Sequence, residues 1–149
     1  MRGRAPPLAY SAAMVIVRCG SCGAPTTVGL EVIEPDRIDL TVCGEPTLPQ
    51  GTLVRAAPAR TLERWAKAGT TGAVIVQAPE GSVVVHPDDL LPGALQEVGQ
   101  SAGCCGLDGQ DGPNQACACG AVLGTAWTDC WTANEVRFLP DAVQVTEVE

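Results

Sequence analysis

The sequence is poor in aromatic side chains, in histidine and in long apolar runs. Its 149 residues include three Trp, one Tyr, one Phe and one His. No apolar run reaches the roughly 20 residues that span a bilayer, so the sequence predicts no transmembrane helix. A core with so few aromatics must be built from Val, Leu, Ile and Ala, and the 17 Gly and 12 Pro indicate many turns.

Catalytic motifs are also scarce. The single histidine, His86, ends an apolar run and precedes a proline, where a polar cap is a more common role than a partner for a nucleophile or a ligand of catalytic zinc. No glycine run is followed by Lys-Ser or Lys-Thr, the pattern that binds phosphate. We therefore predict no catalytic residue and favour a protein that is not an enzyme.

Basic residues are nearly missing from the C-terminal part. Residues 86–149 contain one arginine, Arg137, and ten acidic residues, a balance of −9. Residues 1–85 contain eight basic and seven acidic residues, a balance of +1. This distribution disfavours binding to nucleic-acid phosphates, which requires Lys and Arg. A solvated acidic surface is the simplest interpretation, and the partner that such a charge favours is a basic protein.

The length corresponds to one ordinary domain, and only the N-terminus differs in character. Residues 1–13 carry two arginines and a mildly apolar stretch that Pro6 and Pro7 interrupt. This stretch is too short and too broken for a signal peptide, so a disordered leader or a misannotated start is expected. The predicted location is therefore the cytoplasm, where thiols stay reduced.

Runs of β-branched residues between turn residues predict a β-rich chain. Two hairpins are expected, with turns at residues 34–36 and 79–81. A short helix is expected to begin at the N-cap Thr61, and Asp88 or Asp89 is expected to cap a second one. The expected strands are 14–18, 26–33, 37–43, 52–57, 73–77, 82–86, 136–139 and 143–147, and the expected helices are 61–67 and 95–98.

Eight cysteines are the most unusual feature, and five of them precede a glycine. Cys19-Gly-Ser-Cys22-Gly leaves one expected strand and enters another, as a thiolate turn around a metal does, and its glycine can adopt a positive φ. A redox CxxC pair would open a helix instead, but Gly, Pro and β-branched residues follow Cys22. Metal binding is therefore favoured over redox chemistry.

Cys117-Ala-Cys119-Gly is the best partner for this turn. Four thiolates would saturate a tetrahedral Zn²⁺ ion, which makes the predicted site, Cys19, Cys22, Cys117 and Cys119, structural. The metal would join the C-terminal segment to the first hairpin and help to order the Gly- and Asp-rich stretch 101–114. Four thiolates also describe an iron site of the rubredoxin type, so iron is the alternative to zinc.

The remaining cysteines allow more than one grouping. Cys104, Cys105 and Cys130 could form a second site. Alternatively, Cys130 and one of Cys104 and Cys105 could join Cys117 and Cys119 around one metal, and the sequence does not choose between the two. Trp127 and Trp131 flank Cys130 and are expected to pack over the metal site. Cys43 ends an apolar run and is expected to be a small buried hydrophobe.

The two cysteine turns resemble zinc-ribbon and zinc-knuckle hairpins. The segment from Gly103 to Gly120, together with Asp129-Cys130-Trp131, is also similar to a block from small uncharacterised bacterial proteins. The resemblance covers about a quarter of the chain. It implies metal ligation and no particular activity.

These observations predict a β-rich α+β fold of antiparallel hairpins, one or two short helices and a metal-clipped C-terminal segment. Residues 14–149 would form a single zinc-binding, β-rich domain. The predicted function is that of a non-enzymatic, cytoplasmic protein-interaction module with an acidic C-terminal half. The alternative is a thiol redox or rubredoxin-like electron-transfer protein that uses Cys19 and Cys22.

Overall fold

The computed structural model describes residues 13–64, 72–99 and 103–148. These residues form eleven short strands and two 3-10 turns, η1 (Pro35–Arg37) and η2 (Pro87–Asp89), and they contain no α-helix. The predicted α+β class is therefore wrong, because the described chain is β-rich without helices. The strands are β1 (Val15–Cys19), β2 (Glu31–Val32), β3 (Thr52–Ala57), β4 (Arg60–Arg64), β5 (Ala73–Ala78), β6 (Ser82–Val85), β7 (Leu95–Glu97), β8 (Gln115–Cys117), β9 (Val122–Trp127), β10 (Glu135–Phe138) and β11 (Val143–Glu147).

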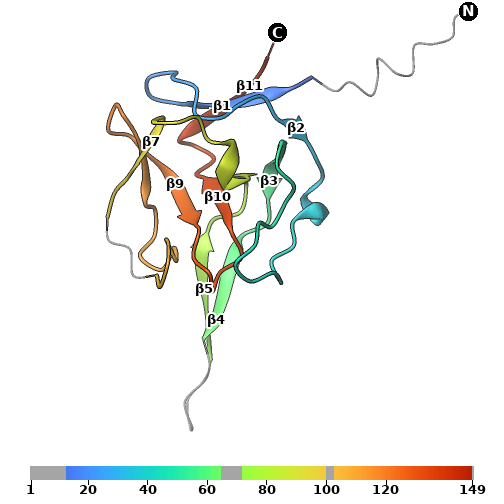
Figure 1. The fold of residues 1–149 in the computed structure, drawn as a ribbon, viewed down its shortest axis with the longest axis vertical. Coiled ribbons are helices and arrows are strands. Elements are labelled where there is room, and N and C mark those ends of the chain that lie inside the picture. Colours follow the sequence, from blue (N-terminus) through green and yellow to red (C-terminus); the bar gives the residue numbers. More distant parts are fainter. Residues whose placement is uncertain (1–12, 65–71, 100–102, 149) are drawn as a thin grey trace, which may run out of the picture.

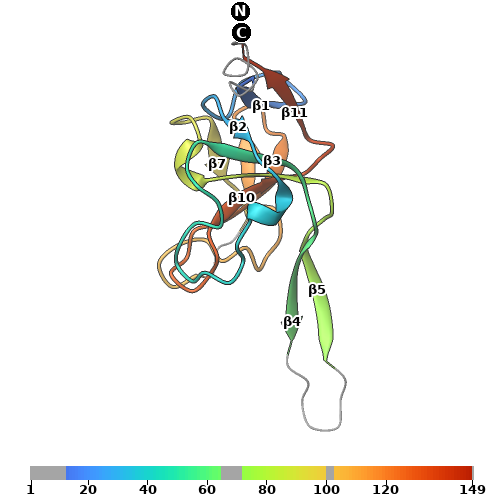
Figure 2. The same cartoon turned by 90° about the vertical axis from the view of Figure 1, so that its right-hand side faces the viewer.

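A seven-stranded sheet forms the body of the molecule, with the strand order β2-β3-β6-β10-β9-β8-β7. Its pairs are antiparallel except for β2 and β3, which run parallel. Strands β1 and β11 pair antiparallel and lie across one end of the body (Figure 1). Strands β4 and β5 form a ribbon that projects from the opposite end (Figure 2). Within the described residues no helix has the length and apolarity to cross a membrane.

The main core lies between the body and the β1–β11 pair. It includes Val17 of β1, Val85 of β6, Phe138 of β10 and Val143 of β11. A smaller cluster on the other face of β3 and β6 contains Val54 and Val84 and is covered by residues 33–48. The alternation of Val83, Val84 and Val85 between these clusters follows from the two-residue period of a strand.

Neither predicted helix forms in the described residues. Arg60–Arg64 is strand β4, which pairs with β5, and the rest of the segment 61–67 lies outside the described residues. The segment 95–98 holds strand β7, which pairs with β8. Long-range pairing prevails because four to seven residues are too few to stabilise a helix by local bonds alone.

The predicted helix caps also have other roles. The Nδ1 atom of His86 accepts the N–H of Asp88 at 2.9 Å and so caps η2. Asp89 is buried, and its carboxylate accepts the N–H of Gly51 at 2.7 Å. The expectation of a polar cap at His86 agrees with this geometry, whereas that of an Asp capping residues 95–98 is wrong.

The two predicted hairpins are wrong in their pairing. Strands β5 and β6 follow one another without pairing, because β3 and β4 form one leg of a long ribbon and β6 and β5 form the other. Each leg contains a proline in the gap between its two strands, Pro58 between β3 and β4 and Pro79 between β5 and β6, as expected for residues without a backbone donor. The first predicted hairpin fails because η1 begins at Pro35 and no strand covers residues 37–43.

Candidate metal centre

The first cysteine turn connects strand β1 to a segment that runs back along it. Cys19 is the last residue of β1, and its N–H donates to the carbonyl of Ala24 at 2.9 Å. The N–H of Gly23 donates to the carbonyl of Cys19 at 2.8 Å, and Gly23 has a φ of 79°. The N–H of Ser21 donates to the Cys19 Sγ at 3.4 Å. This is the geometry of a thiolate turn, in which backbone donors face sulfur.

The second cysteine turn repeats this plan at the end of strand β8. The N–H of Cys117 donates to the carbonyl of Ala121 at 2.8 Å, and the N–H of Gly120 donates to the carbonyl of Cys117 at 2.8 Å. Gly120 has a φ of 97°. The second turn is one residue shorter than the first, which explains why it carries CxC in place of CxxC.

The structure brings the thiols of these two turns together. The Sγ atoms of Cys19 and Cys119 are 3.7 Å apart, and those of Cys22 and Cys117 are 3.6 Å apart. All four sulfurs lie within 4.8 Å of one another. Four thiolates about 2.3 Å from a central Zn²⁺ would be about 3.8 Å apart, so this group could hold a metal ion.

The four-cysteine group lies at the boundary between two sheets. Cys19 and Cys117 are buried and belong to the main core, whereas Cys22 and Cys119 are exposed. Cys19 belongs to the β1–β11 sheet, and Cys117 belongs to the seven-stranded sheet. A metal bound here would therefore connect both sheets through one ion.

The two buried thiols, Cys19 and Cys117, differ in their pKa values. Burial raises the pKa of Cys19, but the N–H groups of Cys22 and Ser21 and the thiols of Cys119 and Cys117 lower it to about 7. The N–H of Cys119 lowers the pKa of Cys117, but burial and the neighbouring thiols raise it to about 12. Four thiolates without a cation would repel one another, so full deprotonation of the group needs a bound metal.

A second group forms where residues 103–107 contact residues 128–130. It consists of the thiols of Cys105 and Cys130 and the carboxylate of Asp129, with ligand atoms that all lie within 4.8 Å of one another. Cys104 is exposed and is not a member of this group. Neither Cys105 nor Cys130 shares a group with Cys117 and Cys119 in the described residues, so the structure does not contain the alternative local grouping.

Sequence reasoning missed Asp129. Its carboxylate accepts the N–H of Cys105 at 2.8 Å and faces the thiols of Cys105 and Cys130 at 3.4 Å and 3.9 Å. Several hydrogen bonds lower the pKa of Asp129, and the bond from the Cys105 N–H has the largest effect. The pKa of Cys130 rises to about 12, chiefly through its hydrogen bond with Cys105 and then through burial and nearby negative charge. The only sequence signal was the position of Asp129 directly before Cys130.

Two further sequence expectations near this group are wrong. Cys43 is exposed rather than buried, and its thiol donates to the carbonyl of Cys130 at 3.5 Å. Trp131 is 76% exposed and does not pack over Cys130. Trp127 is fully buried, and the guanidinium of Arg60 lies 4.0 Å from the centre of its ring.

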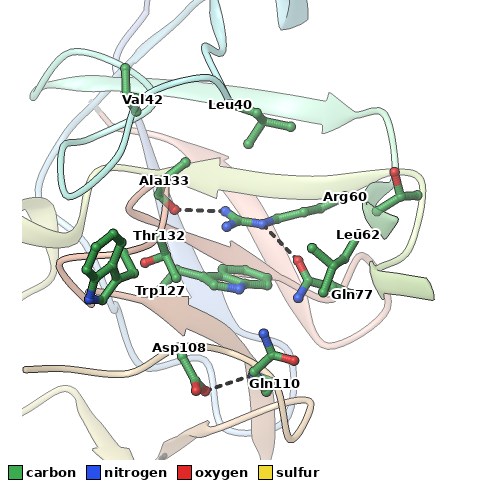
Figure 3. Close-up of a pocket in the computed structure, with 12 residues that line it drawn as sticks. Leu40, Val42, Arg60, Leu62, Gln77, Asp108, Gln110, Trp127, Thr132 and Ala133 are labelled. Carbon is green, nitrogen blue, oxygen red and sulfur yellow. Dashed lines mark hydrogen bonds between the residues drawn. The ribbon is translucent and has the colours of Figure 1, made fainter. Parts of the chain in front are cut away.

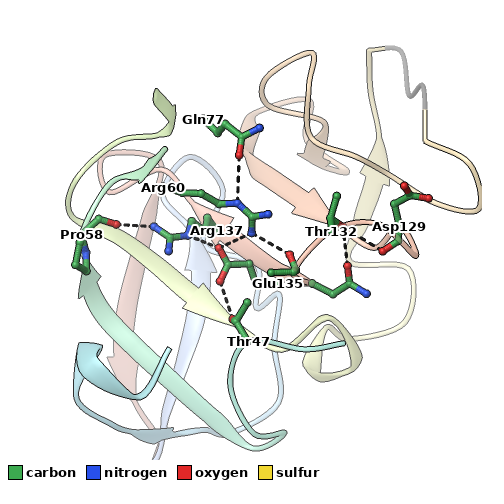
Figure 4. Close-up of polar contacts among 10 residues, drawn as sticks. Thr47, Pro58, Arg60, Gln77, Asp129, Thr132, Glu135 and Arg137 are labelled. Carbon is green, nitrogen blue, oxygen red and sulfur yellow. Dashed lines mark hydrogen bonds and ion pairs between the residues drawn. The ribbon is translucent and has the colours of Figure 1, made fainter. Parts of the chain in front are cut away.

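A buried ion network anchors the projecting ribbon to the body (Figure 4). The carboxylate of Glu135 is fully buried and accepts bonds from Arg60 at 3.0 Å, from Arg137, and from the hydroxyl of Thr47 at 2.7 Å. Arg137 also donates to the carbonyl of Pro58 at 2.6 Å. Burial lowers the pKa of Arg60, and Glu135 opposes this effect. The network shows why Arg137, the single basic residue of the acidic C-terminal part, does not reach the surface.

Arg60 also forms one wall of a small cavity of about 260 Å³ (Figure 3). Trp127 and Gln77 also line it, and the Nε of Arg60 donates to the side-chain oxygen of Gln77 at 3.4 Å. Arg60 and the side-chain oxygen of Gln77 already bond to the protein, whereas the buried Nε1 of Trp127 has no hydrogen-bond partner among the described residues. No protein-family model matches the chain, and neither a curated protein nor a solved structure matches it.

Proposed function

We propose that this protein is a non-enzymatic, zinc-stabilised protein-interaction module. Cys19, Cys22, Cys117 and Cys119 would hold one structural Zn²⁺ ion. The observation that carries this proposal is the arrangement of the four sulfurs: the Sγ–Sγ distances of 3.7 Å and 3.6 Å match the edges of a tetrahedral zinc–thiolate site.

The surroundings of the thiols favour a structural metal over dithiol redox chemistry. A reactive CxxC pair is usually activated at the N-terminus of a helix. Cys19 instead ends a strand, and Cys22 lies in the turn that follows it. Each of the two cysteines faces a thiol from the other turn, which is the arrangement of a four-thiolate site. Such a site has no open position for chemistry.

The zinc would supply much of the stability of the molecule. Structural zinc contributes on the order of 10 kcal/mol, which is similar to the free energy of unfolding of a small domain. In this chain the ion would hold the β1–β11 sheet against the body, where the inner sulfurs already pack in the core. Removing it should release that pair of strands.

Thiol accessibility tests the zinc site directly. In the native, metal-replete protein, Cys19, Cys22, Cys117 and Cys119 should resist a thiol reagent, while the exposed Cys43 should react quickly. A chelator should make the four protected thiols reactive and lower the unfolding temperature. If all eight thiols react at once before the chelator is added, the proposed site is wrong.

The surface charge supports a basic protein as the partner. Residues 86–149 carry ten acidic residues, of which Asp89, Asp129 and Glu135 are buried. Arg137, their single basic residue, is also buried. Within the described residues, no ion pair with Lys or Arg involves the remaining carboxylates of this part. The exposed ones are Asp88, Glu97, Asp111, Asp141 and Glu147.

Salt dependence tests the proposed partner. The immobilised protein should retain basic proteins at low salt and release them as the salt concentration rises, because exposed charges are screened. A matched variant with Asp111→Asn and Asp141→Asn should retain less. Binding that does not respond to salt, or that is unchanged in the variant, would contradict a charge-driven partner.

A further inference from the structure

The second thiol group is built on two segments that the backbone locks together. Leu107 donates to the hydroxyl of Thr128 at 2.9 Å, and its carbonyl accepts the N–H of Thr128 at 2.8 Å. Any side chain at Gly106 would lie 2.5 Å from the carbonyl oxygen of Thr128, so only glycine permits this approach. The positions of Cys105 and Cys130 are therefore fixed by the fold rather than by their own thiols.

These segments place two thiols and one carboxylate around a single point. The N–H of Cys130 donates to the Cys105 Sγ at 3.0 Å, and the N–H of Cys105 donates to Asp129 at 2.8 Å. Each of the two cysteines thus has both its backbone and its sulfur directed into the group. The three ligand atoms lie within 4.8 Å of one another, which is close enough to share one cation.

The group lacks a counter-charge. Asp129 is only 3% exposed, yet none of the ion pairs in the described residues involves it. A buried carboxylate normally has a basic partner or a metal. Its partners here are backbone N–H groups, including that of Cys105, and the thiols of Cys105 and Cys130, which become good ligands for a cation once it displaces their protons.

The donor atoms indicate the class of cation. Mg²⁺ and Ca²⁺ prefer sites built only from oxygen, whereas two sulfurs and one oxygen suit Zn²⁺ and similar borderline ions. Zinc sites with three protein ligands keep a fourth position for water or another ligand. Cys105 and Cys130 are exposed, so this position would face solvent.

We propose that Cys105, Asp129 and Cys130 bind a second, zinc-type divalent cation and leave one coordination position open. This site differs from the four-thiolate site in its residues, its ligand number and its access to solvent. It would take water at rest and accept a nitrogen or sulfur donor from outside. The inference does not depend on the proposed function, because no residue is common to the two sites.

Metal content tests the second site. Protein loaded with Zn²⁺ and passed through a desalting column should hold two ions per chain. Cys105→Ser and Asp129→Asn should each hold one, and the asparagine can still accept the Cys105 N–H, so the loop should keep its fold. Cys43→Ser is the matched control, because Cys43 contacts the carbonyl of Cys130 but is not in the group, and it should hold two.

Two results would overturn the second site. One is a single ion per chain in the wild type that Cys117→Ser removes and Asp129→Asn retains, which would leave the proposed structural zinc intact. The other is two ions in both Cys105→Ser and Asp129→Asn. A single ion that Asp129→Asn removes and Cys117→Ser retains would support the second site and contradict the structural one.

Cobalt tests the open position. In the Co²⁺-loaded wild type, added imidazole should shift the visible d–d bands, because it replaces the bound water. Asp129→Asn should show no shift, since only the closed four-thiolate site would remain. A wild-type spectrum that imidazole leaves unchanged would contradict an open position.

Discussion

At the scale of single residues, a buried charged side chain needs partners of opposite charge. Glu135 is fully buried and holds two arginines, one from the ribbon and one from its own strand. Such a network adds little net stability compared with an apolar core, but it is costly to break. The network therefore fixes the base of the β4–β5 ribbon rather than driving the collapse of the chain.

Replacing Glu135 should destabilise the protein strongly. Glu135→Gln would leave Arg60 and Arg137 buried without a negative partner, and we expect a loss of about 3–5 kcal/mol in the free energy of unfolding. Urea unfolding measures this loss. Glu97→Gln, which changes an exposed carboxylate on β7, is the control and should change stability by less than about 0.5 kcal/mol. Equal midpoints for the two variants would contradict a structural role of the network.

The thiol of Cys19 should titrate well below an ordinary cysteine in the metal-free protein. Its pKa is lowered to about 7, so the folded state binds this proton more weakly than the unfolded chain. The resulting stability is present above pH 9 and is lost as the pH falls from about 9 to about 7. Thiolate absorbance should show a step near pH 7 that Cys19→Ser removes. A first step only near pH 9 would contradict this environment.

At the scale of elements, the two cysteine turns are versions of one hairpin. Both begin on the last residue of a strand, and both close with a bond from a glycine N–H to the carbonyl of the first cysteine. A Cβ atom added at Gly23 or Gly120 would have no other atom of the described residues within 4 Å. The positive φ alone therefore requires glycine there.

Gly120→Ala should weaken the metal site through the backbone. Alanine at a positive φ costs about 1–2 kcal/mol, and here relief of that strain would move the Cys119 thiol. Gly112→Ala is the matched control, because Gly112 has a φ of 86° and equally open space but lies outside both cysteine groups. We expect similar losses of stability for the two variants and a lower zinc affinity only for Gly120→Ala. Equal zinc affinities would show that the turn does not position the thiol.

The elements also show how far the sequence can be interpreted. Strands β3 and β11 match the expected ranges 52–57 and 143–147, because each contains β-branched residues and lies between clear turn residues. The pairing of the strands was harder to predict, since the proline-containing turn at 79–81 joins β5 to β6 although these two strands do not pair. The short helices were wrong because local capping signals cannot reveal a strand partner far along the chain.

For the candidate sites too, local motifs could be predicted from the sequence, whereas contacts between distant segments could not. Spacing and glycine placement identified the four cysteines that the structure brings together, since each turn is a local motif. The joining of the two turns depends on the β1–β11 pair and on β8, which are distant in sequence. Asp129 was missed because a carboxylate next to a cysteine has no distinctive local pattern, and its role depends on residues 103–107 folding over it.

At the scale of the whole molecule, the proposed metal would hold one end of the chain, and buried charges anchor the other. The four-cysteine group lies where the β1–β11 sheet meets the body, whereas the Glu135 network supports the ribbon that projects from the opposite end (Figures 1 and 2). Metal removal should therefore affect the first end before the second. Loss of zinc should detach β1 and β11, while the ribbon keeps its ion network.

Zinc content is the most direct test of the four-thiolate site. Cys22 is the best position for the variant, because it is exposed and serine there leaves the core intact. Elemental analysis should find that purified Cys22→Ser holds one zinc ion per chain fewer than the wild type. A wild type without zinc, or a variant with the same zinc content as the wild type, would contradict the account.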